Sequence, residues 1–183
     1  MKTSRLAQLA LSLGLLAGGA ALGASSESHI SVRLPQASYN VRLTGDDIVA
    51  PHLQLYHSRQ ELRGRAFDAT AALSLKEDRV TGTIGGTLVN LKVTAQGDTV
   101  KGEGGFLGRP AEVRFNPREL HVYVTGCTYE LKNTEGTYVG RRSCDRAFER
   151  SSEVAIPEMF GQLTPSEQVA LLLLSLSGAA APR

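Results

Sequence analysis

The feature that most constrains the fold is the alternation of apolar and polar residues within short segments. It is clearest in residues 73–75, 91–95, 113–115 and 120–124, and residues 30–34, 39–43 and 53–57 repeat it. A period of two sends successive side chains to opposite faces of a β-strand. Each segment is therefore expected to be a strand with one face on a core.

Turn-forming residues separate these segments at regular intervals. They occupy residues 76–79, 96–99, 116–119 and 133–136, about 18–20 residues apart, which leaves room for two short strands between turns. The turn chemistry is that of tight hairpins, with glycine or Asn-Pro at the positions that need them. The sequence predicts a mainly β fold, an antiparallel meander of about nine or ten short strands forming a small barrel or sandwich. A β-solenoid with the same period is the minor alternative.

The units share a weak internal repeat, in which the glycines of Leu62-Arg63-Gly64, Val80-Thr81-Gly82 and Val100-Lys101-Gly102 align. Any β-meander reuses such hairpin patterns, and we prefer that explanation to a true duplication.

The strand pattern is irregular at Gly126, where the apolar residues change from even-numbered to odd-numbered positions. If residues 120–131 form one strand, a bulge or bend at Gly126 would reconcile its two halves.

The first residues have the three-part pattern of a secretory signal peptide. Lys2 and Arg5 precede an apolar run over residues 6–22, and small residues follow up to Ala24. The run is short for a membrane anchor, which needs roughly 20 residues, so cleavage near Ala24 is expected. Removing Lys2 and Arg5 leaves 18 basic residues against 18 acidic ones. A neutral exported chain lacks the basic surplus of a nucleic-acid-binding protein.

Cys127 and Cys144 are expected to form a disulfide, because an even cysteine count in an exported chain favours one. A two-residue hairpin loop at Glu135 and Gly136 would place the two cysteines directly opposite each other as a non-hydrogen-bonded pair. The same register pairs Glu130 with Arg141. A type I turn with a bulge at Gly136 is the alternative, and it would shift the register by one residue.

The C-terminal part has a different character. Thr164-Pro165-Ser166-Glu167 is a capping-box start, residues 168–177 suit a helix, and Gly178 is a natural end. Residues 169–174 are apolar with no polar face, so this helix is either buried or covered by a partner. If it is buried, we expect it to cap an open end of the sheet. The expected organisation is a signal peptide over residues 1–24, an antiparallel β domain over 25–150, a helical segment packed on it over 151–178, and a disordered tail over 179–183.

No catalytic constellation emerges from the sequence. His52 and His57, five residues apart in a strand-like segment, should lie on opposite faces, which is unsuited to a shared metal. A basic cluster containing Arg141, Arg142 and Arg146, with Tyr129 and Tyr138 nearby, is the candidate binding surface. We prefer a simpler explanation of the charges, a solvated strand end balanced by acidic neighbours. No metal site, cofactor or catalytic residue is assigned.

These observations lead to an exported, non-enzymatic protein of the periplasm or extracellular space that acts by binding or structural association. Its expected partners are an envelope protein, a glycan or a small apolar ligand, with no nucleic acid and no membrane span after signal cleavage. One alternative is a β-barrel carrier with an apolar pocket for a small ligand. Another is an envelope hydrolase built on His52, His57 and Asp46 or Asp47, which requires these residues to converge.

Overall fold

The chain forms a closed antiparallel β-barrel with a helix inside it. The computed structural model describes residues 27–144 and 150–178; the expected signal peptide over 1–24, the tail over 179–183 and Arg146 lie outside these residues. In the described residues, fourteen strands pair in sequence order, and β1 closes the barrel against β14. The barrel alternative is thus confirmed over the sandwich and the solenoid, whereas the expected count of nine or ten strands is wrong.

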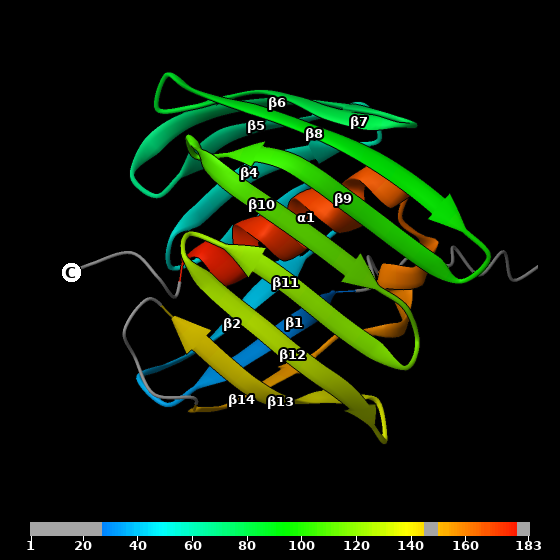
Figure 1. Ribbon diagram of the computed structural model, residues 1–183. Coiled ribbons are helices and arrows are strands. Elements are labelled where there is room, and N and C mark those ends of the chain that lie inside the picture. The colour runs from blue at the N-terminus through cyan, green and yellow to red at the C-terminus, as the bar shows by residue number, and fades with distance from the viewer. Residues whose placement is uncertain (1–26, 145–149, 179–183) are drawn as a thin grey trace, which may run out of the picture.

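The strands are joined by short turns, and a single 3-10 helix and a single α-helix follow the last of them in the described residues (Figure 1). In chain order the elements are β1 (Ser28–Leu34), β2 (Ala37–Leu43), β3 (Asp47–Ala50), β4 (Leu53–Ser58), β5 (Glu61–Ala66), β6 (Ala69–Lys76), β7 (Arg79–Ile84), β8 (Thr87–Gln96), β9 (Thr99–Phe106), β10 (Arg109–Phe115), β11 (Glu119–Val124), β12 (Cys127–Thr134), β13 (Thr137–Cys144), β14 (Arg150–Ala155), η1 (Glu158–Gln162) and α1 (Pro165–Ser177).

The strand count was underestimated because several of the turns escape sequence patterns. The four expected turns all join strands at one end of the barrel, which we call the η1 end because η1 follows β14 there. At the opposite end, which we call the Gly178 end, the connections include Phe67-Asp68, Leu107-Gly108 and Thr125-Gly126, where every residue has a positive φ. Phenylalanine, leucine and β-branched threonine seldom adopt that conformation, so these turns look like strand in the sequence.

The apparent change of face at Gly126 is one of these hidden turns. The expected bulge or bend within one strand is wrong, since β11 ends at Val124 and β12 begins at Cys127, and these two residues pair directly.

The expected hairpin that contains the disulfide is confirmed, and it consists of β12 and β13. Cys127 and Cys144 are cross-strand partners bonded to each other, with Cα atoms 4.0 Å apart, and Glu130 pairs with Arg141. The two-residue turn at Glu135 and Gly136 is therefore the correct alternative.

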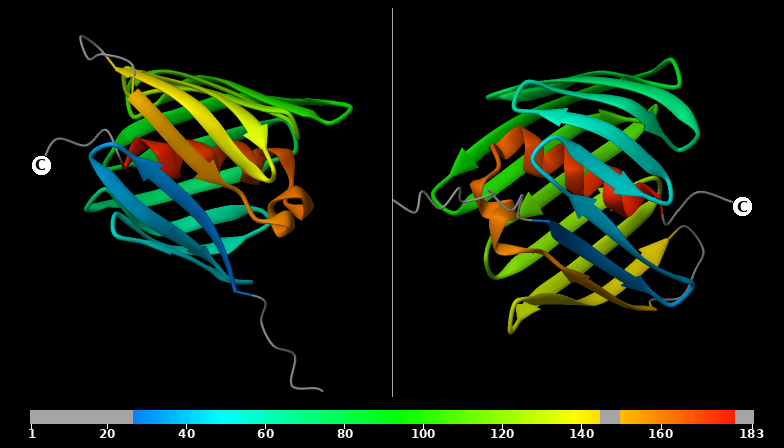
Figure 2. Two further views of the ribbon diagram at one scale, coloured as in Figure 1. Left: turned by 90° about the horizontal axis from the view of Figure 1, so that it is seen from below. Right: turned by 180° about the vertical axis from the view of Figure 1, so that it is seen from behind.

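The helix α1 runs along the inside of the barrel from the η1 end to the Gly178 end, as the three views in Figures 1 and 2 agree. The expectation that it caps an open end is therefore corrected. Every residue from Ser166 to Ser177 is buried, and α1 contacts the strands from β6 to β11. Eight strands already leave room for side chains within a barrel, and diameter grows with strand number. A barrel of fourteen strands needs further filling, and α1 supplies it.

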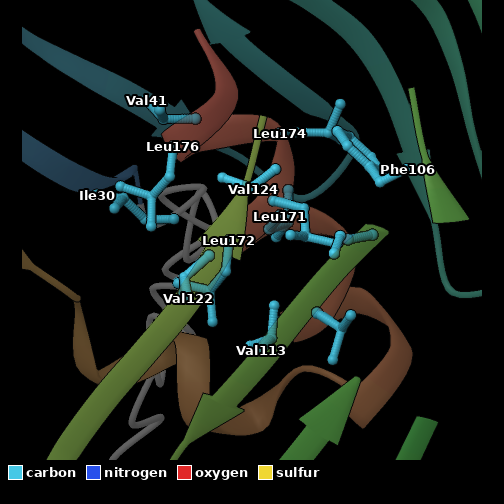
Figure 3. Close-up of a cluster of buried hydrophobic side chains, with 14 of the residues drawn as sticks. Ile30, Val41, Phe106, Val113, Val122, Val124, Leu171, Leu172, Leu174 and Leu176 are labelled. Carbon is cyan, nitrogen blue, oxygen red and sulfur yellow. The ribbon is translucent and has the colours of Figure 1, made fainter. Parts of the chain in front are cut away.

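The core is one layer of strand side chains wrapped around α1. Figure 3 shows Leu171, Leu172, Leu174 and Leu176 among inward side chains from β1, β2, β9, β10 and β11. Each fully buried side chain of this kind contributes about 1.5–3 kcal/mol relative to exposure. Outward positions of the same strands carry mostly charged and polar residues. The alternation seen in the sequence is thus the inside and outside of the barrel.

Two glycines on β9 allow close packing, one against α1 and the other against the neighbouring strand β8. A Cβ on Gly102 would lie 2.4 Å from Cγ1 of Val169, so the missing side chain makes room for α1. Gly104 has a φ of +147° and lies so close to β8 that a Cβ would be 2.2 Å from the carbonyl oxygen of Asn90. Gly64 and Gly82 share this conformation. The structural equivalent of these two glycines is therefore Gly104, and the alignment with Gly102 was two residues out of register.

Gly104→Ala is expected to destabilise the barrel by about 2–3 kcal/mol, because alanine is strained at this φ and its methyl group meets a backbone oxygen. Gly105→Ala is the matched control on the next residue, where a Cβ meets nothing within 4 Å. The control should change the free energy of unfolding by no more than about 1 kcal/mol. Urea denaturation followed by circular dichroism measures both; equal values for the two variants would contradict this account of the close approach between β9 and β8 at Gly104.

Candidate functional site

The residues of the predicted binding cluster are divided between the two faces of the barrel wall. Arg141 points outward and donates from Nη2 to Oε2 of Glu130 at 3.1 Å. Arg142, the next residue on β13, points inward, where its Nε donates to the Tyr129 hydroxyl at 3.0 Å. Tyr138 is buried at the η1 end, and its hydroxyl donates to the carbonyl of Asn116 at 2.9 Å. The structure brings Arg142 and Tyr129 together and separates both from Arg141 and Tyr138.

The Gly178 end of α1 is held by tyrosines of the barrel wall. The last four carbonyls of a helix have no partner within the helix. The hydroxyl of Tyr39 donates to the carbonyl of Ser175 at 2.5 Å, and that of Tyr129 donates to the carbonyl of Leu176 at 3.2 Å. Burial raises the pKa of both phenols, so they remain neutral donors. Two strands thus supply the capping groups that the helix itself lacks.

His52 is the third group at this end. Its Nε2 lies 3.2 Å from the carbonyl of Leu174, and since a carbonyl only accepts, Nε2 carries the proton. Burial lowers the pKa of His52, which favours this neutral form. The ring stacks on Phe67 with centroids 5.4 Å apart, and a Cβ on Gly178 would lie 2.2 Å from it. Gly178 is therefore the residue that lets the chain pass the imidazole ring.

Arg142 completes the network as a cation near the carboxyl end of α1. Its guanidinium lies 5.6 Å above the Tyr129 ring, and Nη2 approaches Sγ of Cys127 at 3.3 Å. A positive charge near a helix C-terminus is favourable, because the carbonyls there carry partial negative charge. The disulfide hairpin thus positions Arg142 and Tyr129, which in turn anchor the helix.

The η1 end of α1 has a different anchor, built on a buried carboxylate. Thr164 and Glu167 form the expected capping box, and Oε1 of Glu167 also contacts Nε2 of His57 at 2.8 Å. Burial alone would raise the pKa of Glu167, but its hydrogen bonds with His57 and Thr164 outweigh that effect and hold the pKa below its ordinary value of 4.5. Glu167 is therefore ionised inside the barrel near neutral pH.

The histidines do not form a catalytic pair. His52 and His57 both face the lumen, so the expectation that they lie on opposite faces is wrong. Pro51 and His52 form the turn before β4, where strand alternation does not apply. The rings contact opposite ends of α1, while Asp46 and Asp47 are exposed. The convergence required of a hydrolase is not seen, and the described residues contain no group of three or more potential metal ligands.

Two of the hollows outside the lumen are lined by residues of the predicted binding cluster, Arg141 in one and Tyr138 in the other. One, of about 480 Å³, runs over the outer face of β10–β13, and its lining mixes charges of both signs, among them Arg114, Glu130, Lys132 and Arg141. The other, of about 580 Å³, lies at the η1 end between η1 and three hairpin turns, and we call it the η1 hollow. Its walls include Phe115, Tyr138, Ile156, Leu163, Pro165 and Gln168.

Sequence reasoning missed the residues that hold α1, although one signal was available. His57 lies at every-second-residue spacing from Leu53 and Leu55 in β4, so its side chain is on the same inward face as theirs. A buried imidazole needs a hydrogen-bonding partner, and Glu167 of the capping box was the acidic residue already expected at a buried helix end. Tyr39 gave no such signal, because its contact spans 136 positions of sequence.

No helix in the described part of the chain has the length and apolar content to cross a membrane. Comparison with protein-family models, with curated proteins and with solved structures finds no match to this chain.

Tyr129→Phe should lower the free energy of unfolding by about 1–3 kcal/mol, since it leaves the Leu176 carbonyl and the Arg142 Nε without their common partner in a buried place. Tyr56→Phe is the matched control, because Tyr56 is 51 % exposed on the outer face. It should stay within about 0.5 kcal/mol of the parent. A similar loss in both variants, measured by urea denaturation, would show that the hydroxyl does not support the helix end.

The ionised form of Glu167 should stabilise the fold above pH 4.5 and cease to do so as the pH falls. Its pKa is depressed in the folded state, so the folded form binds the proton later than the unfolded chain, and stability is lost as the pH falls through the folded pKa. Glu167→Gln keeps a capping-box residue but lacks the charge. We expect it to cost about 1.5–3 kcal/mol at pH 7, with the difference shrinking at pH 3–4.

The control for this comparison is Glu158→Gln, which removes an exposed carboxylate of η1. Its stability should follow the parent at every pH in a series of urea titrations. If the difference between the Glu167→Gln variant and the parent is the same at pH 3 as at pH 7, the charge of Glu167 has no role in the fold.

Proposed function

We propose that this chain is an exported, non-enzymatic binding protein of the cell envelope or the extracellular space, and that its partner binds on the outer surface and ends of the barrel. The observation that carries the proposal is the position of α1. The helix fills the lumen, where a small-ligand carrier of this architecture would hold its ligand. The surfaces available to a partner are then those outside the lumen.

The energy needed to empty the lumen supports this choice. Withdrawing α1 exposes six large apolar side chains, Val169, Leu171, Leu172, Leu173, Leu174 and Leu176, which amounts to roughly 10 kcal/mol or more. It also breaks the hydrogen bonds at both helix ends. A whole domain is stable by only about 5–15 kcal/mol. Opening the lumen for a ligand is thus comparable in cost to unfolding the protein.

The disulfide supports the export part of the proposal. Cys127 and Cys144 are bonded to each other, and structural disulfides form and persist mainly in oxidising compartments outside the cytoplasm. The signal-peptide pattern over residues 1–24 agrees with this location. Both features support the proposal of a periplasmic or secreted protein.

A cross-link between α1 and the wall tests whether binding uses the lumen. The pair Gly102→Cys and Val169→Cys is suited to it, because a Cβ on Gly102 would lie 3.2 Å from the Cβ of Val169, slightly under the 3.5–4.5 Å of a disulfide. The matched control replaces the same two residues with serine, which has a similar size and forms no bond.

The partner is first identified by co-purification of the native exported protein and mass spectrometry, and its affinity for the cross-linked and the serine variants is then measured by calorimetry. We expect equal affinity, within a factor of two, because the surface is the same in both. Loss of binding in the cross-linked variant alone would mean that the partner enters the lumen, and the carrier alternative would replace this proposal.

A further inference from the structure

The two sulfur atoms of the disulfide have different surroundings. Cys127 is only 3 % exposed, and it pairs on both sides, with Val124 of β11 and with Cys144 of β13. Cys144 is partly exposed, and in the described residues β13 pairs with β14 no further than Arg142. An external thiol therefore has better access to the sulfur of Cys144 than to that of Cys127.

The buried sulfur is in contact with a cation. Nη2 of Arg142 donates to Sγ of Cys127 at 3.3 Å, and Nε of the same guanidinium donates to the Tyr129 hydroxyl. No carboxylate of the described residues lies within 4.0 Å of Arg142, so none of them neutralises its charge in an ion pair. The positive charge of Arg142 is thus directed at the disulfide.

This contact favours one direction of thiol–disulfide exchange, in which a thiolate attacks one sulfur and the other sulfur leaves as a thiolate. A sulfur leaves faster when its thiol has a lower pKa, and an adjacent arginine lowers the pKa of a cysteine below its ordinary value of about 8.5. Burial of Cys127 acts in the opposite direction, but a charge in direct contact is felt strongly where water is excluded. Cys144 is therefore suited to be attacked, and Cys127 to leave.

The carboxyl end of α1 is the other electrostatic feature of this region. Its carbonyls carry partial negative charge, which disfavours a thiolate nearby. The carbonyls of Leu174, Ser175 and Leu176 each accept a hydrogen bond from a side chain of the barrel wall. These donors offset part of the negative charge, and the full charge of Arg142 remains the dominant influence on the Cys127 sulfur.

We propose that Cys127 and Cys144 form a redox-active site that exchanges with an external dithiol. One thiolate of the dithiol attacks Sγ of Cys144, a mixed disulfide forms, and Cys127 leaves with the bonding electron pair as a thiolate held by Arg142. The second thiolate of the dithiol then attacks the first dithiol sulfur, and Cys144 leaves as a thiolate. The dithiol loses two electrons and two protons and becomes a disulfide, and the chain gains them as two thiols.

This inference goes beyond the proposed function. It concerns a covalent reaction at the Gly178 end of the barrel, and it holds or fails independently of where a binding partner docks. In it, Arg142 is a positioning residue for charge: it does not react, but it stabilises the sulfur that leaves.

Mapping the mixed disulfide tests the direction of attack. The folded, oxidised protein is treated briefly with glutathione, a monothiol that forms the mixed disulfide but cannot close a ring of its own. Free thiols are then blocked with iodoacetamide, and mass spectrometry of the peptides locates both groups. We expect glutathione on Cys144 and the blocking group on Cys127, with a ratio of about ten or more to one over the reverse arrangement. Equal amounts of the two arrangements, or glutathione mainly on Cys127, would overturn the inference.

A charge variant tests the role of the guanidinium. Arg142→Met keeps a long side chain but removes the charge, and reduction by dithiothreitol should become slower by about fivefold or more. Arg63→Met is the matched control, because Arg63 contacts Glu61 on the outer face of β5, and its rate should stay within about twofold of the parent. Arg142→Lys, which keeps a positive charge, should recover part of the lost rate.

The sign of this effect separates the charge of Arg142 from its structural contacts. Loss of the bond to Tyr129 loosens the hairpin, and a loosened hairpin exposes its disulfide and is reduced faster. A slower reduction of the Arg142→Met variant therefore cannot result from a destabilised barrel. A rate equal to that of the parent, or faster, would show that Arg142 does not assist the departure of the Cys127 sulfur, and the inference would be abandoned.

Discussion

The structure depends on the burial of a helix that has no polar face. Residues 169–174 are apolar on every side, so α1 is stable in water only if a wall surrounds it completely. A sheet packed on one side would leave half of these side chains exposed. The closed barrel provides the wall, and in return α1 fills a lumen too wide for strand side chains alone. Neither element is therefore expected to be stable without the other.

The polar groups inside the barrel follow from this arrangement. A helix in an apolar lumen has unpaired N–H groups at one end and unpaired carbonyls at the other, with no water to satisfy them. Glu167 with His57 serves the first end, and Tyr39, His52 and Tyr129 serve the second. These residue types resemble a catalytic set in composition. Their contacts with the helix ends explain their presence more directly, which is why we place binding at the outer surfaces.

Whether an element can be predicted from the sequence depends on how far apart in the chain its interacting residues lie. Local signals gave the strand alternation, four turns, the capping box of Thr164, and the pairing of Cys127 with Cys144, because each depends on residues close in the chain. The turn at Phe67-Asp68 could not be predicted, since the strain of its positive φ is compensated by sheet closure around it. The strand β14 was also missed. Its segment Arg-Ser-Ser-Glu-Val-Ala has little apolar character, and pairing with both β13 and β1 determines its structure.

The η1 hollow was beyond sequence analysis for a related reason. Asp98, Phe115, Tyr138 and Glu158 come from four segments that meet only because strand order and barrel closure bring alternate turns to one end. The same closure buries the Gln168 amide, whose Nε2 donates to the carbonyls of Phe160 and Leu163 while its Oε1 accepts no hydrogen bond from the described residues. A barrel already filled by its own helix leaves a partner only its outer surface and its two ends.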